Sequence, residues 1–161
     1  MITVWVVLEN EHPVTDVAVD RRSNFSCRWV PRRSMDFPEQ ALISLPNPKV
    51  HQIHNGAQIL TSTDSRDFKA LIEPSLSESV QIQGDVLSGF VFEDRYSWMM
   101  LAREDQMESN VFSGNVEEIR YIWDTSDGRD SSSSTVVTNS PRAEFPGRMM
   151  AAGKLVRVTV D

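Results

Sequence analysis

The 161-residue chain is 40% hydrophobic and 24% charged with a net charge of -7, values typical of one globular domain and not of a disordered chain. A chain of this length buries enough surface to fold without covalent staples, and its single cysteine, Cys27, excludes an intramolecular disulfide. The apolar run after Met1 ends at Glu9, too soon to span a bilayer, so we expect no signal peptide or transmembrane segment and a cytoplasmic or particle-assembled protein.

The first third of the chain is predicted to form strands. Residues 2–8 are as rich in Val and Trp as a central strand is, and residues 14–19 alternate between apolar and polar side chains with one irregularity. Residues 25–30 alternate as well. This third alternation should turn the following side chains towards a core: Phe25, Cys27 and Trp29.

The middle of the chain predicts two short helices and a hairpin. Residues 37–45 follow an aspartate cap, and a glutamate completes the capping-box spacing. Residues 50–54 and 57–61 flank Asn55-Gly56, the pair favoured in two-residue hairpin turns. A second helix is predicted over residues 65–73, because their apolar side chains recur at intervals of three and four.

The second half is predicted as strands with one further helix. The helix runs from residue 140 to 152, opened by Ser140-Pro141, and the serine-rich residues 124–134 are a solvated loop. The predicted strands are 79–83, 86–92, 96–102, 116–123, 135–138 and 154–160.

These elements predict a single domain over residues 1–161. We expect an α+β fold that is mainly antiparallel β, either a sandwich or a strongly curved sheet, with two or three short covering helices. The first and last strands look buried, so we expect them to pair with each other.

The strongest local signal is a cluster of five arginines between Arg21 and Arg33, with no acidic residue among them in an acidic chain. Such a charge asymmetry gives the surface an electrostatic potential that is positive at this segment and negative elsewhere. We interpret the segment as a docking patch for an acidic protein surface, with an aromatic anchor. Its residues are Arg21, Arg22, Arg28, Trp29, Arg32 and Arg33. Two interpretations stay open beside it: aromatic and arginine side chains that bind single-stranded nucleic acid, and an ordinary strand with solvated arginines.

Signals for catalysis and metal binding are weaker. His51 and His54 have a metal-ligand spacing for a helix, but in a strand residues three apart point to opposite faces. Asp124, Asp127 and Asp130 do not fall at the alternate positions of a calcium loop. The sequence contains no nucleophile elbow or glycine-rich phosphate loop. We therefore expect no catalytic residues, no metal and no cofactor.

The last third consists of EIRYIWD, a polar loop, a predicted short helix and KLVRVTV. This succession resembles in pattern the end of small β-rich accessory proteins of bacterial secretion systems. The resemblance covers roughly a quarter of the chain, and no functional residue is carried over from it.

The sequence therefore predicts a non-enzymatic module for protein–protein interaction or structural assembly, as a component of a viral particle or a secretion apparatus. One alternative is a small enzyme that acts on a polar substrate with His51 or His54 as its base. The other is a nucleic-acid-binding protein or antagonist that uses residues 21–33.

Overall fold

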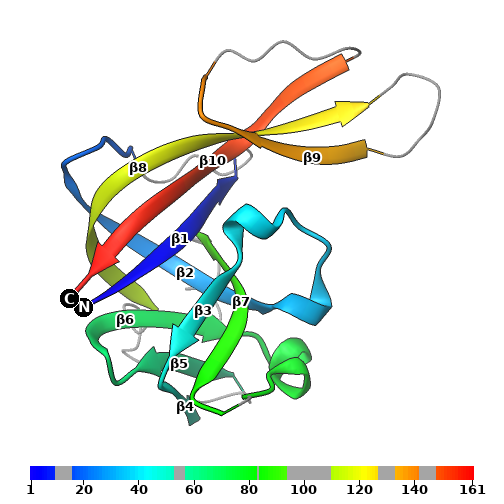
Figure 1. Ribbon diagram of the computed structural model, residues 1–161. Coiled ribbons are helices and arrows are strands. Elements are labelled where there is room, and N and C mark those ends of the chain that lie inside the picture. The colour runs from blue at the N-terminus through cyan, green and yellow to red at the C-terminus, as the bar shows by residue number, and fades with distance from the viewer. Residues whose placement is uncertain (10–15, 53–56, 83, 94–109, 127–132, 142–147) are drawn as a thin grey trace.

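The computed structural model describes residues 1–9, 16–52, 57–82, 84–93, 110–126, 133–141 and 148–161, and these residues form mainly strands (Figure 1). The strands are β1 (Ile2–Glu9), β2 (Arg22–Pro31), β3 (Ile43–Pro46), β4 (Pro48–Gln52), β5 (Gln58–Ser62), β6 (Ser65–Ile72), β7 (Val86–Glu93), β8 (Val111–Ser126), β9 (Ser133–Thr138) and β10 (Arg148–Val160). Between them lie the short 3₁₀ helices η1 (Arg32–Ser34), η2 (Glu39–Ala41) and η4 (Pro74–Ser79). Within the described ranges, no helix has the length and apolarity needed to cross a membrane.

Five of the strands close into a barrel. β1 pairs antiparallel with β10, β10 with β8, β8 with β2 and β2 with β7, and β7 returns to β1 in the parallel direction. A sheet closed in this way has an inner face that side chains fill. Ile2 lies opposite Val160, so the expected pairing of the first and last strands is confirmed.

The other strands extend the sheet from this barrel. β3 pairs with β7, and β4, β5 and β6 form a meander that joins β2 where Arg28 lies opposite Leu71. The start of β6 and the residue before it bind both chain ends. The backbone N–H of Asp67 donates to the carbonyl oxygen of Asp161 at 2.8 Å, and the N-terminal amine donates to the carbonyl oxygen of Asp64 at 2.7 Å. The meander thus covers the end of the barrel where the termini lie (Figure 1).

Aromatic rings fill the interior of the barrel. The ring centroid of Phe112 lies 5.6 Å from that of Phe25 and 5.3 Å from that of Phe68. Trp29 is fully buried in the same cluster, and it packs on Gly89, where a Cβ atom would lie 2.5 Å from the indole. The missing side chain of Gly89 therefore allows β7 to pass close to Trp29.

A second apolar cluster, called the outer cluster below, lies on the outer face of the barrel. Its buried members are Val7, Val30, Ala41, Phe90, Phe92, Ile122 and Leu155. Phe37 covers it from the segment that carries η2, with its ring edge-on to Phe90 at 5.7 Å and to Phe92 at 5.3 Å between centroids. Because neighbouring residues of β1 and β7 enter different clusters, both strands are buried on two faces.

Three strands continue beyond the barrel as a projecting sheet, called the arm below (Figure 1). It consists of residues 121–126 of β8, the whole of β9, and residues 148–152 of β10. The indole Nε1 of Trp123 donates to the hydroxyl of Thr138 at 2.9 Å and links β8 to β9.

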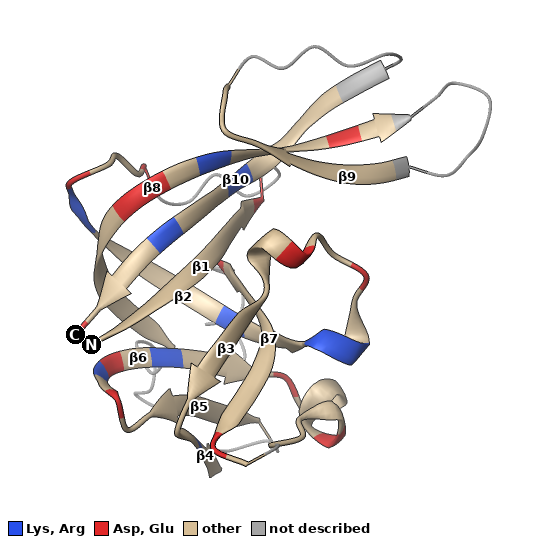
Figure 2. Ribbon diagram, in the orientation of Figure 1, with Lys and Arg blue, Asp and Glu red and all other residues tan. Residues whose placement is uncertain are grey.

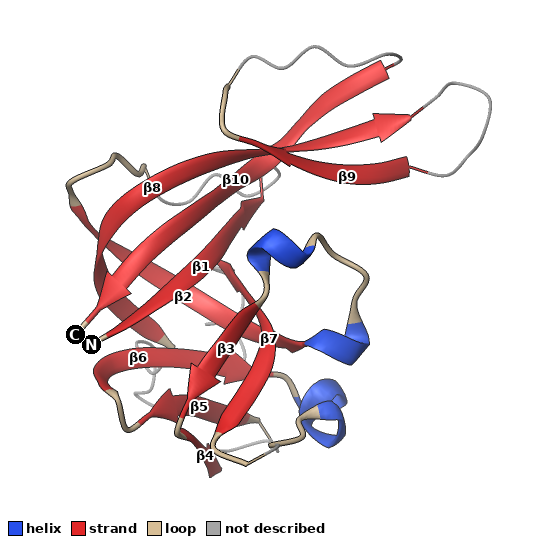
Figure 3. Cartoon of the chain, in the orientation of Figure 1, coloured by secondary structure: helices blue, strands red, loops and turns tan. Residues whose placement is uncertain are grey.

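The predicted α+β class, with two or three covering helices, is wrong. Residues 37–45 contain only η2 followed by the start of β3, and residues 65–73 hold β6 instead of a helix. From residue 148 onwards the third predicted helix is part of β10, and residues 142–147 lie outside the described residues. The fold is mostly β with a mixed sheet, and helical structure in the described segments is limited to 3₁₀ helices (Figure 3).

The error over β6 has a simple cause. Phe68 and Ile72 are four apart, so they share a face in a helix and in a strand alike. Ala70 decides between the two, because Phe68, Ala70 and Ile72 enter the barrel core whereas Leu71 enters a separate cluster on the other face. That is the alternation of a strand buried on both faces, and apolar spacing alone cannot distinguish it from a short helix.

Most of the predicted strands are present. The confirmed ones are 2–8, 25–30, 86–92, 116–123, 135–138 and 154–160. The prediction over 79–83 is wrong, because η4 runs through Ser79 and β7 begins only at Val86. Of the predicted strand 14–19, residues 16–19 are not in a strand, and residues 14–15 lie outside the described residues. The predicted strand 96–102 lies outside them as well.

The predicted hairpin is confirmed as an antiparallel pair, β4 with β5. Its register differs by one residue from the prediction. Gln52 lies opposite Gln58, whereas a two-residue turn at Asn55-Gly56 would place Gln52 opposite Ile59. The turn itself lies outside the described residues.

Candidate functional site

The predicted docking residues do not form one surface. β2 spans the ten residues Arg22–Pro31. At a rise of about 3.3 Å per residue, its two ends lie roughly 30 Å apart. Arg21 and Arg22 are at one end, Arg28 is within the strand, and Arg32 and Arg33 follow the other end in η1. Figure 2 accordingly shows basic positions at separate points along this part of the chain.

Trp29 does not belong to any surface. Its side chain has no solvent exposure, and its indole Nε1 has no hydrogen-bond partner within the described part of the chain. Phe25 and Cys27 are equally buried, so the inward alternation predicted for this strand is confirmed. Trp29 therefore cannot act as the aromatic anchor of a docking patch, and neither it nor Phe25 can stack on a nucleic-acid base from the folded barrel.

Arg22 and Arg28 have carboxylate partners within the protein. Arg22 lies 3.8 Å from the carboxylate of Asp67 and 3.4 Å from that of Asp161. Arg28 lies 3.7 Å from Glu9, and its guanidinium is 5.0 Å from the ring centroid of Phe92. Both arginines thus have carboxylates of the chain itself as partners, and solvent screens the pairs of Arg22 more than that of Arg28, because Arg22 is 45% exposed and Arg28 22%.

The other end of β2 opens into a cleft of about 310 Å³, called the basic cleft below. Pro31 ends the strand, so the chain turns into η1 and carries Arg32 and Arg33 to the rim. The opposite walls come from the end of η4 and the start of β7. The lining residues are Pro31, Arg32, Arg33, Ser79, Gln81, Val86, Leu87 and Ser88.

The positive charges of Arg32 and Arg33 are not offset by a carboxylate among the described residues that line the cleft. Arg33 donates from Nη1 to the neutral amide oxygen of Gln81 at 3.0 Å, and no ion pair joins it to a carboxylate of the described residues. Arg32 pairs with Glu39 at 2.9 Å, but both side chains are more than half exposed, so solvent screens the pair strongly. No Asp or Glu is among the lining residues that the structure describes.

This arrangement suits an anion with several acceptor oxygens. The planar guanidinium of Arg33 presents paired N–H donors, and serine hydroxyls on two walls can donate to the same group. Sequence inspection missed Ser79, Gln81 and Ser88, because Arg33 and Gln81 are 48 residues apart and no local motif joins them.

Of the candidate catalytic and metal-binding residues, His51 and Asp124 lie among the described residues. His51 is exposed on β4, where its Nε2 lies 3.0 Å from the hydroxyl of Thr61, and it lines none of the described pockets. His54, Asp127 and Asp130 lie outside the described residues. Among the residues that are described, no three His, Cys, Asp or Glu side chains form a metal-binding group.

Comparison with known proteins gives no relative. No family model, no curated protein and no solved structure matches this chain. The chemistry of the basic cleft must therefore be inferred from its own residues.

Proposed function

We propose that the protein is a non-enzymatic interaction module that binds a carboxylate-bearing segment of a protein partner in its basic cleft. The observation that carries this proposal is Arg33, an exposed guanidinium whose hydrogen bond goes to a neutral amide in a cleft without described carboxylates. A partner carboxylate would supply the acceptor that the cleft lacks.

The proposal retains two of the five arginines of the predicted patch, Arg32 and Arg33. Arg22 and Arg28 are committed to internal partners, and Arg21 stands at the far end of β2. We infer that such a module acts within a larger assembly, either in the cytoplasm or in a particle. One exposed site for a short acidic segment is the kind of contact through which subunits of an assembly recognise each other.

Binding of a fluorescein-labelled hexaglutamate peptide tests the proposal by fluorescence anisotropy at low and high salt. We expect Arg33→Gln to weaken binding about tenfold, since a hydrogen bond to a charged group contributes about 1.5–3 kcal/mol. Arg66→Gln is the matched control, because this arginine is 83% exposed on β6, outside the cleft. Equal affinity for the wild type and Arg33→Gln would overturn the proposal, and so would an equal loss in the control.

A parallel titration with single-stranded DNA separates this function from the nucleic-acid alternative. If DNA binds through the same cleft more tightly than hexaglutamate, the preferred anion is a phosphate and the partner is not an acidic protein.

A further inference from the structure

A second opening lies between the arm and the barrel, and it differs in character from the basic cleft. It is a groove of about 360 Å³, and it shares no residue with that cleft. We call it the acid-rimmed groove. Its lining residues come from β1, β7, β8, β9, β10 and the segment after η1.

The floor of the groove is apolar and fixed. Val7, Phe92 and Ile122 belong to the outer cluster, and each has at most 3% exposure. Met35 and Phe37 are half-buried and form a side wall. A floor of this kind accepts an apolar side chain and buries it without rearranging the barrel.

The rim of the groove is negatively charged. Asp124 from the arm and Glu9 from the end of β1 both line it, and no Lys or Arg is among its described lining residues. Asp124 is exposed, and it accepts a hydrogen bond from the hydroxyl of Thr135 at 3.3 Å but has no cationic partner among the described residues. Glu9 lies 3.7 Å from Arg28, which offsets only part of the rim charge.

Met150 stands at the mouth of the groove with 72% exposure. It is one of a few large apolar side chains that the described surface leaves so exposed. A methionine has three flexible side-chain bonds and a polarisable sulfur, so it can adapt to apolar groups of different shape. Met35 on the side wall is a second methionine with the same flexibility.

We propose that the acid-rimmed groove binds a protein segment in which an apolar side chain stands next to a lysine or arginine. The apolar side chain lies on the floor formed by Val7, Phe92 and Ile122, and the basic side chain lies against Asp124. This occupant is opposite in charge to the one assigned to the basic cleft. The chain therefore has two recognition sites on either side of one segment, because Arg33 lines the cleft and Met35 lines the groove.

Three labelled hexapeptides test the proposal by fluorescence anisotropy: alternating leucine–lysine, leucine–glutamate and serine–lysine. We expect the leucine–lysine peptide to bind more tightly than the other two and to weaken at high salt. Equal binding of the leucine–lysine and leucine–glutamate peptides would show that the groove recognises only apolar surface. Equal binding of the serine–lysine peptide would show that it recognises only charge. Either result overturns the proposal, as does the absence of binding.

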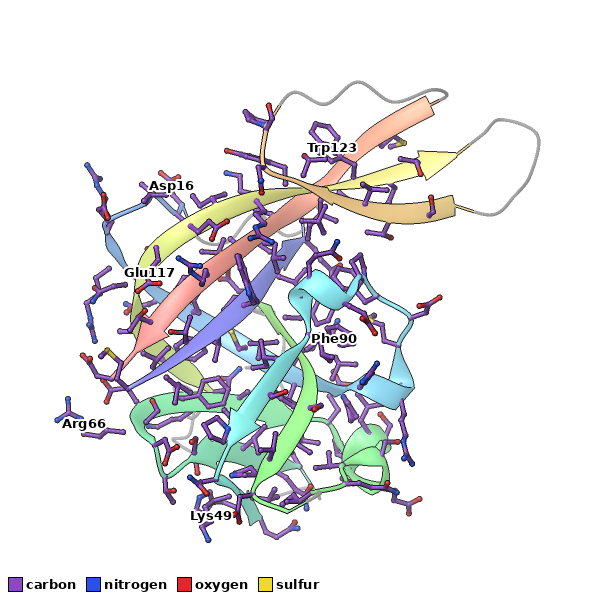
Figure 4. All side chains as sticks on the ribbon, viewed as in Figure 1. Asp16, Lys49, Arg66, Phe90, Glu117 and Trp123 are labelled. Carbon is purple, nitrogen blue, oxygen red and sulfur yellow. The ribbon has the colours of Figure 1, made fainter. Side chains whose placement is uncertain are left out.

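Matched variants locate the binding. Asp124→Asn should weaken leucine–lysine binding roughly two- to fivefold, as expected for a partly exposed charge pair. Asp16→Asn makes the same change on an exposed aspartate away from the arm (Figure 4) and should have no effect. At the mouth, Met150→Lys should weaken binding more than Met150→Glu, although both remove the same apolar side chain. The opposite order, or an unaffected Asp124→Asn variant, would overturn the assignment.

The proposal also excludes a second copy of this chain as the occupant. Sedimentation of the wild type and of Met150→Lys measures this directly. We expect both to sediment as the same species, and a wild-type dimer that Met150→Lys dissociates would assign the groove to self-association and overturn the proposal.

Discussion

The interior of the barrel and the two openings outside it are built from the same strands in opposite ways. Inside, Phe25, Trp29 and Phe68 have no exposure, and each fills space that the ring of strands has already enclosed. Outside, Arg33 and Met150 are exposed where strands end or run beyond the ring. Closure of the sheet fixes the fold, whereas strand ends outside the ring lie at the surface, where both proposed binding sites are found.

Among these predictions, substitution of a glycine in the barrel wall should cause the largest loss of stability. Gly89→Ala would place a Cβ atom 2.5 Å from the indole of Trp29 and 2.7 Å from the carbonyl oxygen of Val30. Neither neighbour can move within a closed core, so we expect a loss of about 3 kcal/mol in the free energy of unfolding. Urea denaturation followed by tryptophan fluorescence measures it.

Gly84 is the control for this prediction. It has a φ of +64°, and no atom lies within 4 Å of the position that a Cβ atom would take, so Gly84→Ala adds backbone strain without a clash. We expect a loss of about 1 kcal/mol, the usual cost of a left-handed alanine. If the two variants lost equal stability, the tight approach of β7 to Trp29 would not be a feature of the folded protein.

Strands with one buried face could be predicted from the sequence, whereas one strand buried on both faces, β6, could not. The inward faces of β2 and β10 were predictable, because Phe25, Cys27 and Trp29 alternate with polar residues and so do the valines of the last strand. β6 was not predictable, since a strand buried on both faces has lost the polar alternation that distinguishes it from a helix. The parallel return of β7 to β1 has no local signal at all, because it depends on closure of the whole ring.

The candidate site was also only partly predictable from the sequence. The arginine cluster was visible in the sequence, but the sequence could not show that a strand of ten residues separates its members. Nor could it show that Asp67 and Asp161 pair with Arg22, and Glu9 with Arg28. The basic cleft exists only because η4 and β7 meet η1 in space, so Gln81 and Ser88 could not be assigned before the fold was known.

A substitution in the outer cluster should have a smaller effect than one inside the barrel. Phe37→Ala removes a half-buried ring that makes edge-on contacts with Phe90 and Phe92. Each such contact contributes about 0.5–1.5 kcal/mol, so we expect urea denaturation to show a loss of about 2 kcal/mol in the free energy of unfolding. Phe37→Leu keeps an apolar side chain and should lose about half as much. A loss for Phe37→Ala as large as that for Gly89→Ala would remove the distinction between the two clusters.

The smallest effect is expected in the arm, and it should remain local. Trp123→Phe keeps the apolar ring but removes the N–H that donates to the hydroxyl of Thr138. The lost hydrogen bond is worth about 1 kcal/mol, which corresponds to roughly fivefold faster amide hydrogen exchange in β9. Thr138→Val removes the other partner and also the hydrogen bond from this hydroxyl to the carbonyl oxygen of Ser140, so its effect should be larger. Thr138→Ser keeps the hydroxyl and should keep the protection.

Amide hydrogen exchange in β1 shows whether the effect of Trp123→Phe is local to the arm or extends to the barrel. β1 pairs with β10 along its length and with β7 at Val6 and Val7. Amides in this part of β1 should therefore exchange only through global unfolding and be little affected by a change in the arm. If Trp123→Phe accelerated exchange equally in β1 and β9, the arm and the barrel would open together. The acid-rimmed groove would then be as rigid as the core beneath it. Acceleration in β9 alone would mean that the strand that carries Thr135 on the groove wall opens while β1, which carries Val7 on the floor, stays closed.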